Sequence, residues 1–203
     1  MKPFDIKTGI AAPYLANNVD TDVIMPKQFL KRIDRDGLAE GVLFDQRFLY
    51  DGSPNPDFIL NKPEWVNSSF LVVGDNFGCG SSREYAVWGL QQLGIKAIIG
   101  TTFAGIFYDN CQRNGVLLIS ISNAERDLIG KTVSDANINT VTINLPQQTI
   151  LLDNGSCIDF EIDPLKKETL IKGLDIIGST LDKSTLIHAF EKQHLSTNPW
   201  LAD

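Results

Sequence analysis

Short apolar runs, separated by glycine, proline and polar residues, recur along the chain and predict the strands of a sheet. Each run holds four to six residues, many of them Val, Ile, Leu or Phe, which is typical of buried strands. The runs are 69–73, 97–100, 116–119, 141–145, 149–152 and 157–162. The two runs that flank 146–148 indicate a hairpin. The segment 6–15 is a further predicted strand, with a turn at Gly9.

Helical periodicity appears between these runs. Apolar residues at helical spacing predict helices over 84–93 and 103–114, which Gly94 and Gly115 end. Two further helices are predicted over 164–172 and 183–194. Alternating strands and helices are typical of an α/β fold, in which a parallel or mixed sheet is flanked by helices.

The remaining segments are predicted to connect these elements. The segment 27–41 mixes basic and apolar residues and forms a short helix or a loop. The segment 51–63 is rich in Gly, Ser, Asn and Pro, which indicates an exposed connection or, equally, a mobile lid. At 203 residues the chain is expected to form a single domain over 1–203, with a helical extension over about 164–203.

The composition is that of an ordinary globular protein, with 43% hydrophobic and 21% charged residues. No run approaches the roughly 20 apolar residues of a membrane span, and 1–5 lacks the apolar core of a signal peptide. We therefore expect a cytoplasmic protein with no membrane partner. A net charge of −7 disfavours nucleic acid as a partner. A basic cluster either attracts an anionic substrate or forms a solvated face; it consists of Lys27, Lys31, Arg32 and Arg35.

The cysteines and histidines give little support to a self-contained metal or thiol site. Cys79, Cys111 and Cys157 lie far apart and form no C-x-x-C pair, which disfavours a disulfide framework and a zinc or iron–sulfur site. Cys79 could be a nucleophile activated by a helix terminus. The two histidines, His188 and His194, lie on a predicted surface helix, so no motif supports a cysteine–histidine couple.

The most informative motif is 74–84, where an apolar run leads into a glycine-bounded loop that ends in two hydroxyls and a guanidinium. Gly78 and Gly80 permit backbone angles that a side chain would forbid and allow close approach of a ligand. The first amides of the following helix favour negative charge. Arg83 adds a planar fork that suits a carboxylate or phosphate. The motif predicts a carboxylate site with a serine beside it.

An ordinary helix cap competes with this interpretation, because Ser81 to Glu84 fits the S-x-x-E capping box. A cap does not need Gly80, and Arg83 in the first helical turn faces an unfavourable dipole unless an anion compensates it. The glycine spacings of phosphate-binding loops are absent. Both interpretations, the helix cap and the anion site, are therefore retained for the start of this helix.

A second polar motif lies at 17–26, where Asp20 and Asp22 bracket Thr21. A D-x-D pair binds a divalent metal or orients another polar group. Asp and Asn favour turns and caps at least as strongly, so the turn interpretation is preferred for the motif taken alone.

Three motifs in order along the chain resemble the small subunit of 3-isopropylmalate dehydratase, a family similar to the swivelling domain of aconitase. They are 18–26, 74–84 and 103–110. The resemblance runs from the N-terminus to about residue 182, and it is more specific for the superfamily than for one substrate.

This resemblance implies a swivelling β/β/α domain that closes over a separate large subunit, which holds a 4Fe-4S cluster. No metal ligand or cofactor is then expected in this chain. The family reaction removes water from a small hydroxy dicarboxylate and adds it back in the other orientation. It exchanges 2-isopropylmalate and 3-isopropylmalate in leucine biosynthesis, and this hydro-lyase activity requires both subunits.

The resemblance also implies roles for individual residues. Ser81 matches the catalytic base that takes a proton next to a carboxylate, while Ser82 and Arg83 match ligands of a substrate carboxylate. Thr21 and Asp22 match a polar pair that lines the active site. A serine hydroxyl is a poor base in water, so helix amides and nearby positive charge must stabilise its anion.

Two features bear on the choice of substrate. The segment 29–32 matches a substrate-recognition loop, in which Leu30 contacts an isopropyl group or packs inside the protein, and Lys31 or Arg32 faces a carboxylate or solvent. Tyr85 stands where the family usually has histidine and cannot carry its positive charge. A related hydro-lyase acting on citraconate, dimethylmalate or a similar diacid is therefore an alternative, as is a non-catalytic anion-binding paralogue.

Overall fold

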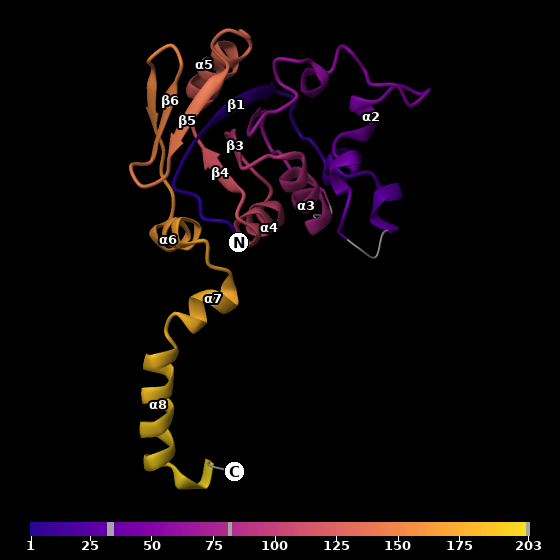
Figure 1. The fold of residues 1–203 in the computed structure, drawn as a ribbon. Coiled ribbons are helices and arrows are strands. Elements are labelled where there is room, and N and C mark those ends of the chain that lie inside the picture. Colours follow the sequence, from indigo (N-terminus) through magenta and orange to yellow (C-terminus); the bar gives the residue numbers. More distant parts are fainter. Residues whose placement is uncertain (32–34, 81–82, 202–203) are drawn as a thin grey trace.

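A mixed sheet forms the centre of the molecule (Figure 1). The structure is a computed structural model that describes residues 1–31, 35–80 and 83–201, and within these ranges the sheet has seven strands in the order β4-β3-β2-β1-β5-β6-β7. The strands are β1 (Ile6–Tyr14), β2 (Phe70–Val73), β3 (Ala97–Gly100), β4 (Leu117–Ser120), β5 (Thr140–Asn144), β6 (Thr149–Leu152) and β7 (Cys157–Asp159). β1 to β4 pair in parallel, and β1, β5, β6 and β7 pair antiparallel. The predicted α/β fold with a mixed sheet is confirmed.

The long first strand joins the parallel and antiparallel halves of the sheet. Its first half pairs with β5 and its second half with β2, and Gly9 continues the strand opposite Val141. The turn predicted at Gly9 is therefore wrong. A Cβ at this position would lie 2.8 Å from the Cβ of Ser69. Glycine here therefore allows the residue before β2 to lie close to β1.

Helices cover both faces of the sheet because alternate residues of its central strands point to opposite sides. In β2, Leu71 joins the core under α3 (Glu84–Leu93) and α4 (Gly105–Asn114), whereas Phe70 joins the core under α5 (Asn123–Val133). We call these the first and the second core. Both sides of the parallel half are therefore buried.

The predicted helix ends are largely confirmed. α3 and α4 end at Gly94 and Gly115, which adopt left-handed φ angles of 106° and 79°. α6 (Pro164–Lys172) has the predicted bounds, and α8 (Ser184–Thr197) runs three residues past the predicted end. The helix α5 was not predicted, although Ser122 and the carboxylate of Glu125 cap it reciprocally.

Short helical turns build the region between β1 and β2. They are α1 (Thr21–Ile24), α2 (Phe44–Arg47) and 3-10 turns over Lys27–Lys31, Leu38–Gly41 and Ile59–Asn61. The segment 51–63 is partly anchored: the Asn61 side chain donates to the carbonyls of Arg47 and Asn55, at 2.6 and 2.8 Å, and Leu60 is buried. Residues 51–54, 56 and 57 are exposed, so the predicted exposed connection is confirmed for them.

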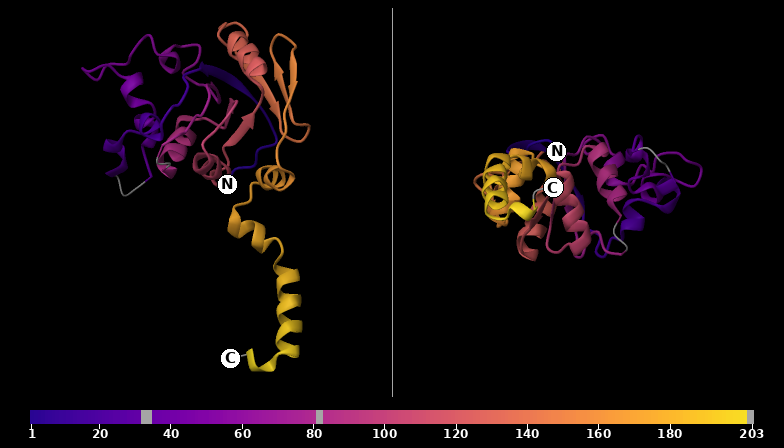
Figure 2. Two further views of the ribbon diagram at one scale, coloured as in Figure 1. Left: turned by 180° about the vertical axis from the view of Figure 1, so that it is seen from behind. Right: turned by 90° about the horizontal axis from the view of Figure 1, so that it is seen from below.

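The C-terminal helices differ in how they meet the body. The amide of Phe4 donates to the carbonyl of Leu170 at 2.9 Å, which ties α6 to the start of the chain. From there α7 (Ile176–Leu181) and α8 leave the body as one arm (Figures 1 and 2). The arm ends in a 3-10 turn, Pro199–Leu201, and exposes large apolar side chains; they include Leu181, Leu186, Phe190 and Trp200. Among the described helices, none has the length and apolar character needed to cross a bilayer.

Candidate active site

The glycine-bounded loop begins where β2 ends and is held against the segment that follows β1. A Cβ on Gly74 would lie 2.4 Å from the carbonyl oxygen of Ala16, so the backbones of these two segments lie in near contact. The amide of Asp75 donates to Oδ1 of Asn17, and the amide of Asn18 donates to the carbonyl of Asp75, each at 2.8 Å. The second polar motif is thereby placed beside the loop.

Further backbone hydrogen bonds bring all three motifs together. The amide of Gly78 donates to the carbonyl of Val19 at 2.8 Å, and the amide of Thr21 donates to the carbonyl of Cys79 at 2.9 Å. The amide of Phe77 donates to the carbonyl of Thr102 at 3.2 Å, which adds the segment before α4. Residues far apart in the sequence thus meet at the carboxyl end of the parallel strands, where ligands of open α/β sheets commonly bind.

Both loop glycines are required by their surroundings, as predicted. Gly78 and Gly80 adopt left-handed φ angles of 78° and 85°. A Cβ on Gly78 would lie 2.3 Å from Cγ of Phe107, and one on Gly80 would lie 2.2 Å from Oδ2 of Asp20. The carboxylate of Asp20 therefore lies directly against the backbone just before the predicted site serines, a neighbour that the sequence did not identify.

The capping box predicted at the start of α3 involves Ser81, which lies outside the described residues. Among the described residues, the helix begins at Glu84 with Arg83 as its N-cap, and the Arg83 side chain does not cap it. The carboxylate of Glu84 accepts from Nδ2 of Asn114 at 2.7 Å, and Oδ1 of Asn114 accepts from the Trp88 indole at 3.0 Å. A partner on α4 therefore engages the glutamate, and the capping box stays a prediction.

The predicted catalytic base Ser81 and its neighbour Ser82 lie outside the described residues, as does Arg32. Arg83 is exposed at the start of α3, and within the described ranges no carboxylate forms an ion pair with it. Its guanidinium and the first amides of the helix can both act on an anion at this end of α3. This arrangement supports a carboxylate site at the loop.

The Asp20–Asp22 motif serves mainly as a cap. Oδ1 of Asp20 accepts from the amide of Asp22 at 2.7 Å and caps α1, as the turn interpretation predicted. Thr21 is only 2% exposed, and the carboxylate of Asp22 lies 3.4 Å from Nζ of Lys27. Thr21 therefore lies under the loop, while Asp22 lies at the surface.

Leu30 and Lys31 lie on the 3-10 turn after α1 and face different surroundings. Leu30 is half-buried and packs against the first core, as the packing alternative predicted. Lys31 is exposed. Arg35 of the predicted basic cluster lies against α3, with its guanidinium carbon 3.7 Å from the centre of the Trp88 ring.

The described cysteines do not form a metal site. Cys79 lies in the loop, Cys111 is buried in α4 and Cys157 is exposed on β7. Burial raises the pKa of the Cys111 thiol well above its usual range. Among the described residues, no group of three or more His, Cys, Asp or Glu side chains converges to hold a metal. These residues therefore do not fit an iron–sulfur cluster.

A charged network supports the loop from the side of α5. Nη1 of Arg126 lies 3.4 Å from Oδ1 of Asp75, and the hydroxyl of Thr101 donates to the same oxygen. The Arg126 side chain is only 12% exposed. No pattern in the sequence links Arg126 to Asp75, because the two residues lie 51 positions apart. The network helps to fix the backbone that leads into the glycines.

Tyr85, the departure from the family pattern, lies in the first turn of α3. Its ring centre is 4.9 Å from that of Trp88, and it packs against the first core. Its ring is half-buried.

Comparisons with known proteins agree with this geometry. Residues 1–124 match the family model of the aconitase C-terminal domain, and residues 177–203 match that of the C-terminal domain of the 3-isopropylmalate dehydratase small subunit. The first match covers the sheet's parallel half and all three motifs. The second covers most of the arm.

Curated relatives and a solved structure extend the likeness along the chain. The chain is 60% identical over 201 residues to 3-isopropylmalate dehydratase small subunit 1 of Mannheimia succiniciproducens, covering 99% of each chain. It is 51% identical to small subunit 2 of Salmonella typhimurium, covering 99% of this chain and 96% of the relative. A crystal structure of 3-isopropylmalate dehydratase from Methanocaldococcus jannaschii superposes with a TM-score of 0.66 at 31% identity, covering 92% of this chain and 99% of that one.

Proposed function

The chain belongs to the family of 3-isopropylmalate dehydratase small subunits, and we propose that its glycine loop supplies one side of a shared active site. The enzyme is a hydro-lyase of leucine biosynthesis that isomerises 2-isopropylmalate and 3-isopropylmalate by dehydration and rehydration. In this proposal the small dicarboxylate lies between the loop and a large subunit.

The observation that carries the proposal is the fixed backbone before α3. Hydrogen bonds from the segment after β1 and the segment before α4 hold Phe77, Gly78 and Cys79. Arg83 follows as an exposed N-cap, where helix amides and a guanidinium act on the same anion. Such an arrangement suits one carboxylate of the substrate. Ser82 is proposed as a second ligand of that carboxylate.

We assign the proton transfer to Ser81. Its Oγ takes the proton from the carbon next to the bound carboxylate, and the negative charge that develops spreads onto that carboxylate. Arg83 and the helix amides stabilise this charge, which lowers the barrier more than it strengthens substrate binding. During rehydration Ser81 returns the proton. Asp20 lies against Gly80 and helps to set the backbone from which Ser81 follows.

The remaining site residues take supporting roles in this proposal. Thr21 is buried under the loop, and we assign it to holding the loop rather than to direct contact with the substrate. Asp22 and Lys31 lie at the surface, where they can meet the large subunit or the substrate. Leu30 packs against the first core and limits the space at this side.

A large subunit is the partner that a small subunit requires, and two features support it. The arm exposes Phe190 at 68% and Trp200 at 73%, and an extended apolar surface of this kind is typical of protein contacts. The cysteines of this chain do not fit a 4Fe-4S cluster, so we place the cluster in the large subunit, where it would supply a Lewis acid. The net charge of −7 supports neither a nucleic-acid partner nor an anionic membrane surface, and we propose a cytoplasmic location.

Turnover of the complex reconstituted with its large subunit under anaerobic conditions tests the proposal. We expect Ser81→Ala to lower kcat by roughly 100- to 10,000-fold, the usual contribution of a general base. The matched control is Ser120→Ala at the exposed end of β4, which should leave kcat unchanged. Co-purification should be the same for both variants. Unchanged turnover of Ser81→Ala would refute the assignment of the base.

The same complex decides the substrate. Steady-state assays with isopropylmalate, citraconate and dimethylmalate compare their kcat/KM values. We expect isopropylmalate to be preferred, and Arg83→Lys to raise KM and lower kcat with every active diacid, because a lysine cannot bind a carboxylate with two parallel bonds. A higher kcat/KM for citraconate or dimethylmalate would contradict the isopropylmalate assignment.

A further inference from the structure

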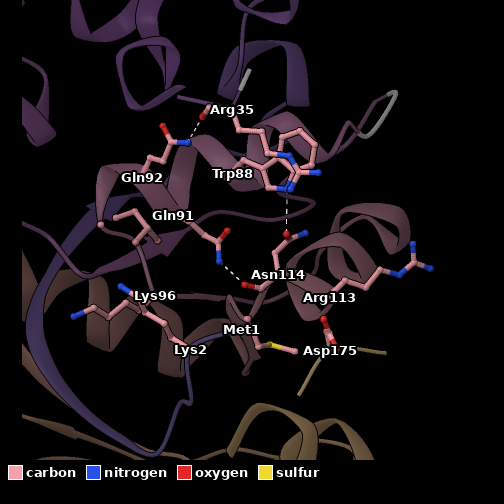
Figure 3. Close-up of a pocket in the computed structure, with 13 residues that line it drawn as sticks. Met1, Lys2, Arg35, Trp88, Gln91, Gln92, Lys96, Arg113, Asn114 and Asp175 are labelled. Carbon is pink, nitrogen blue, oxygen red and sulfur yellow. Dashed lines mark hydrogen bonds between the residues drawn. The ribbon is translucent and has the colours of Figure 1, made fainter. Parts of the chain in front are cut away.

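A cleft of about 690 Å³ lies at the C-terminal ends of α3 and α4, beside the start of the chain and the segment before α7 (Figure 3). Its size is within the roughly 300 to 1,000 Å³ of small-molecule sites. Its charged side chains are Lys2, Arg35, Lys96, Arg113 and Asp175. Its lining includes none of the described residues to which we assign a role in the isomerase reaction.

The charge in this cleft opposes the charge of the whole chain. Four cationic side chains and one carboxylate give a local balance of +3, in a protein of net charge −7. The C-terminal ends of α3 and α4 face the cleft at Gly94 and Gly115, and each adds about half a negative charge. The helix ends therefore compensate only about one of the three positive charges, and about two remain uncompensated. In the described ranges, no ion pair joins these four side chains to a carboxylate.

One wall of the cleft is flat and firmly held. The Arg35 guanidinium lies over the Trp88 ring at 3.7 Å, and the Trp88 indole donates to Asn114. The side chains of Gln91 and Gln92 donate to the carbonyls of Asn114 and Arg35, respectively. These amide donors brace the wall, which leaves the cations as the groups that can recognise a ligand.

The positions of the cations indicate what kind of anion fits. Figure 3 shows Arg35 at one end of the cleft over Trp88, Lys2 and Lys96 on one side, and Arg113 on the other. Because the charged ends do not converge on one point, a single small anion cannot meet them all. A ligand with separated negative groups can. A guanidinium stacked on an indole also offers its outer face to a planar group.

We propose that this cleft binds a small organic polyanion with a planar portion. The planar portion stacks on Arg35, and two or more phosphate or carboxylate groups contact Lys2, Lys96 and Arg113. Phosphate and carboxylate share the chemistry that these cations recognise.

Three probes separate the contributions to binding. ATP carries a planar group and phosphates, benzene-1,3,5-tricarboxylate carries a planar group and carboxylates, and pyrophosphate carries charge alone. Binding to the full chain is followed by the indole N–H resonances of Trp65, Trp88 and Trp200 in nitrogen-15 NMR spectra, each assigned by a Trp→Phe variant. Trp65 is buried in the first core and serves as the internal reference.

We expect a saturable shift of the Trp88 resonance with ATP or the tricarboxylate, or both, at least tenfold tighter than with pyrophosphate, and no shift of Trp65. The ratio of the two planar probes tells phosphate from carboxylate recognition. The double variant Lys96→Gln/Arg113→Gln should weaken binding at least tenfold. A matched control, Lys131→Gln/Lys192→Gln, removes two exposed lysines elsewhere and should weaken it less than twofold.

Three results would overturn the proposal. The first is the absence of a saturable Trp88 shift with either planar probe. The second is equal weakening by the two double variants, which would indicate only general attraction of anions. The third is binding of a poly-glutamate peptide without binding of the planar probes, which would assign the cleft to an acidic protein segment. The titration needs no large subunit, so its outcome is independent of the isomerase assay.

Discussion

The contact between Gly80 and Asp20 gives a direct test of how the glycine-bounded loop is held. In Gly80→Ala, the new methyl group would lie 2.2 Å from Oδ2 of Asp20, on a backbone with a φ of 85°. Two costs then add. The left-handed backbone costs roughly 1 to 2 kcal/mol for a residue with a Cβ. Overpacking against the Asp20 carboxylate costs about 1 to 3 kcal/mol more.

A second glycine separates these costs. Gly52 has a φ of 83°, and a Cβ there would meet no atom within 4 Å. Gly52→Ala therefore carries the backbone cost alone. We expect it to lower the free energy of unfolding by roughly 1 to 2 kcal/mol and Gly80→Ala to lower it by roughly 2 to 5 kcal/mol. For a chain of this size the excess corresponds to a further drop in Tm of about 2 to 12 °C.

The assay is urea unfolding of the two variants, of Asp20→Ala and of Asp20→Ala/Gly80→Ala. Removing the Asp20 carboxylate removes the obstacle, so the double variant should recover about 1 to 3 kcal/mol relative to the sum of the single changes. Asp20→Ala alone should cost about 1 kcal/mol, because it removes the cap of α1. Equal losses for Gly52→Ala and Gly80→Ala, or strict additivity with Asp20→Ala, would refute the close contact.

Two further predictions concern the loop support and the buried thiol. Arg126→Met should lower the free energy of unfolding by about 1 to 2 kcal/mol and reduce turnover of the complex, because Asp75 loses its guanidinium partner and keeps only the Thr101 hydroxyl on that oxygen. Lys131→Met, an exposed change on the same helix, should do neither, and equal effects would contradict the network. Burial raises the pKa of the Cys111 thiol, so folding keeps it protonated, and the stability it contributes is lost as pH rises above the ordinary thiol pKa of about 8.5. Denaturation at pH 8 and pH 10 should therefore show a fall in stability that is smaller in Cys111→Val, and in the native chain iodoacetamide should label Cys157 before Cys111.

Sequence patterns predicted those parts of the fold in which the local sequence determines the secondary structure. A run such as 97–100 is buried on both faces, so its apolar composition predicts a strand without further context. Gly94 and Gly115 end helices because each adopts a left-handed backbone that glycine tolerates. The helix α5 carries an equally local signal in its capping box, although it was not predicted.

Sequence patterns are least informative where a distant residue contacts the segment that carries the pattern. The spacing of Ser81 to Glu84 gives no sign that Asn114 of a neighbouring helix binds the glutamate. Gly9 has the appearance of a turn, but Ser69 occupies the space that a side chain would need. Neither Asn114 nor Ser69 can be assigned to these positions without the tertiary structure, because nothing in their sequence spacing relates them to their partners.

In the candidate site, too, some features could be predicted from the sequence and others depend on tertiary contacts. The resemblance to a known family brought 18–26, 74–84 and 103–110 together as motifs, and the structure explains why they occur together. The segment 74–84 forms backbone hydrogen bonds with 18–26 and, between Phe77 and Ala104, with 103–110. The D-x-D motif marks Asp20 as a polar candidate, but neither its contact with Gly80 nor the contribution of Arg126 could be predicted from the sequence. The cleft proposed to bind a polyanion was also beyond sequence analysis, because its cations lie in four separate segments.

The position of the anchors determines what a change at Ser81 can reveal. On the N-terminal side, Gly78 and Cys79 are held by the carbonyl of Val19, which does not depend on the serine side chain. On the C-terminal side, Glu84 is held by Asn114 of α4. Both anchors therefore persist in Ser81→Ala, so a loss of turnover with unchanged stability and unchanged co-purification reports on the hydroxyl itself. A matching loss of stability would instead mean that the hydroxyl holds the loop, and the proton transfer would then need another base.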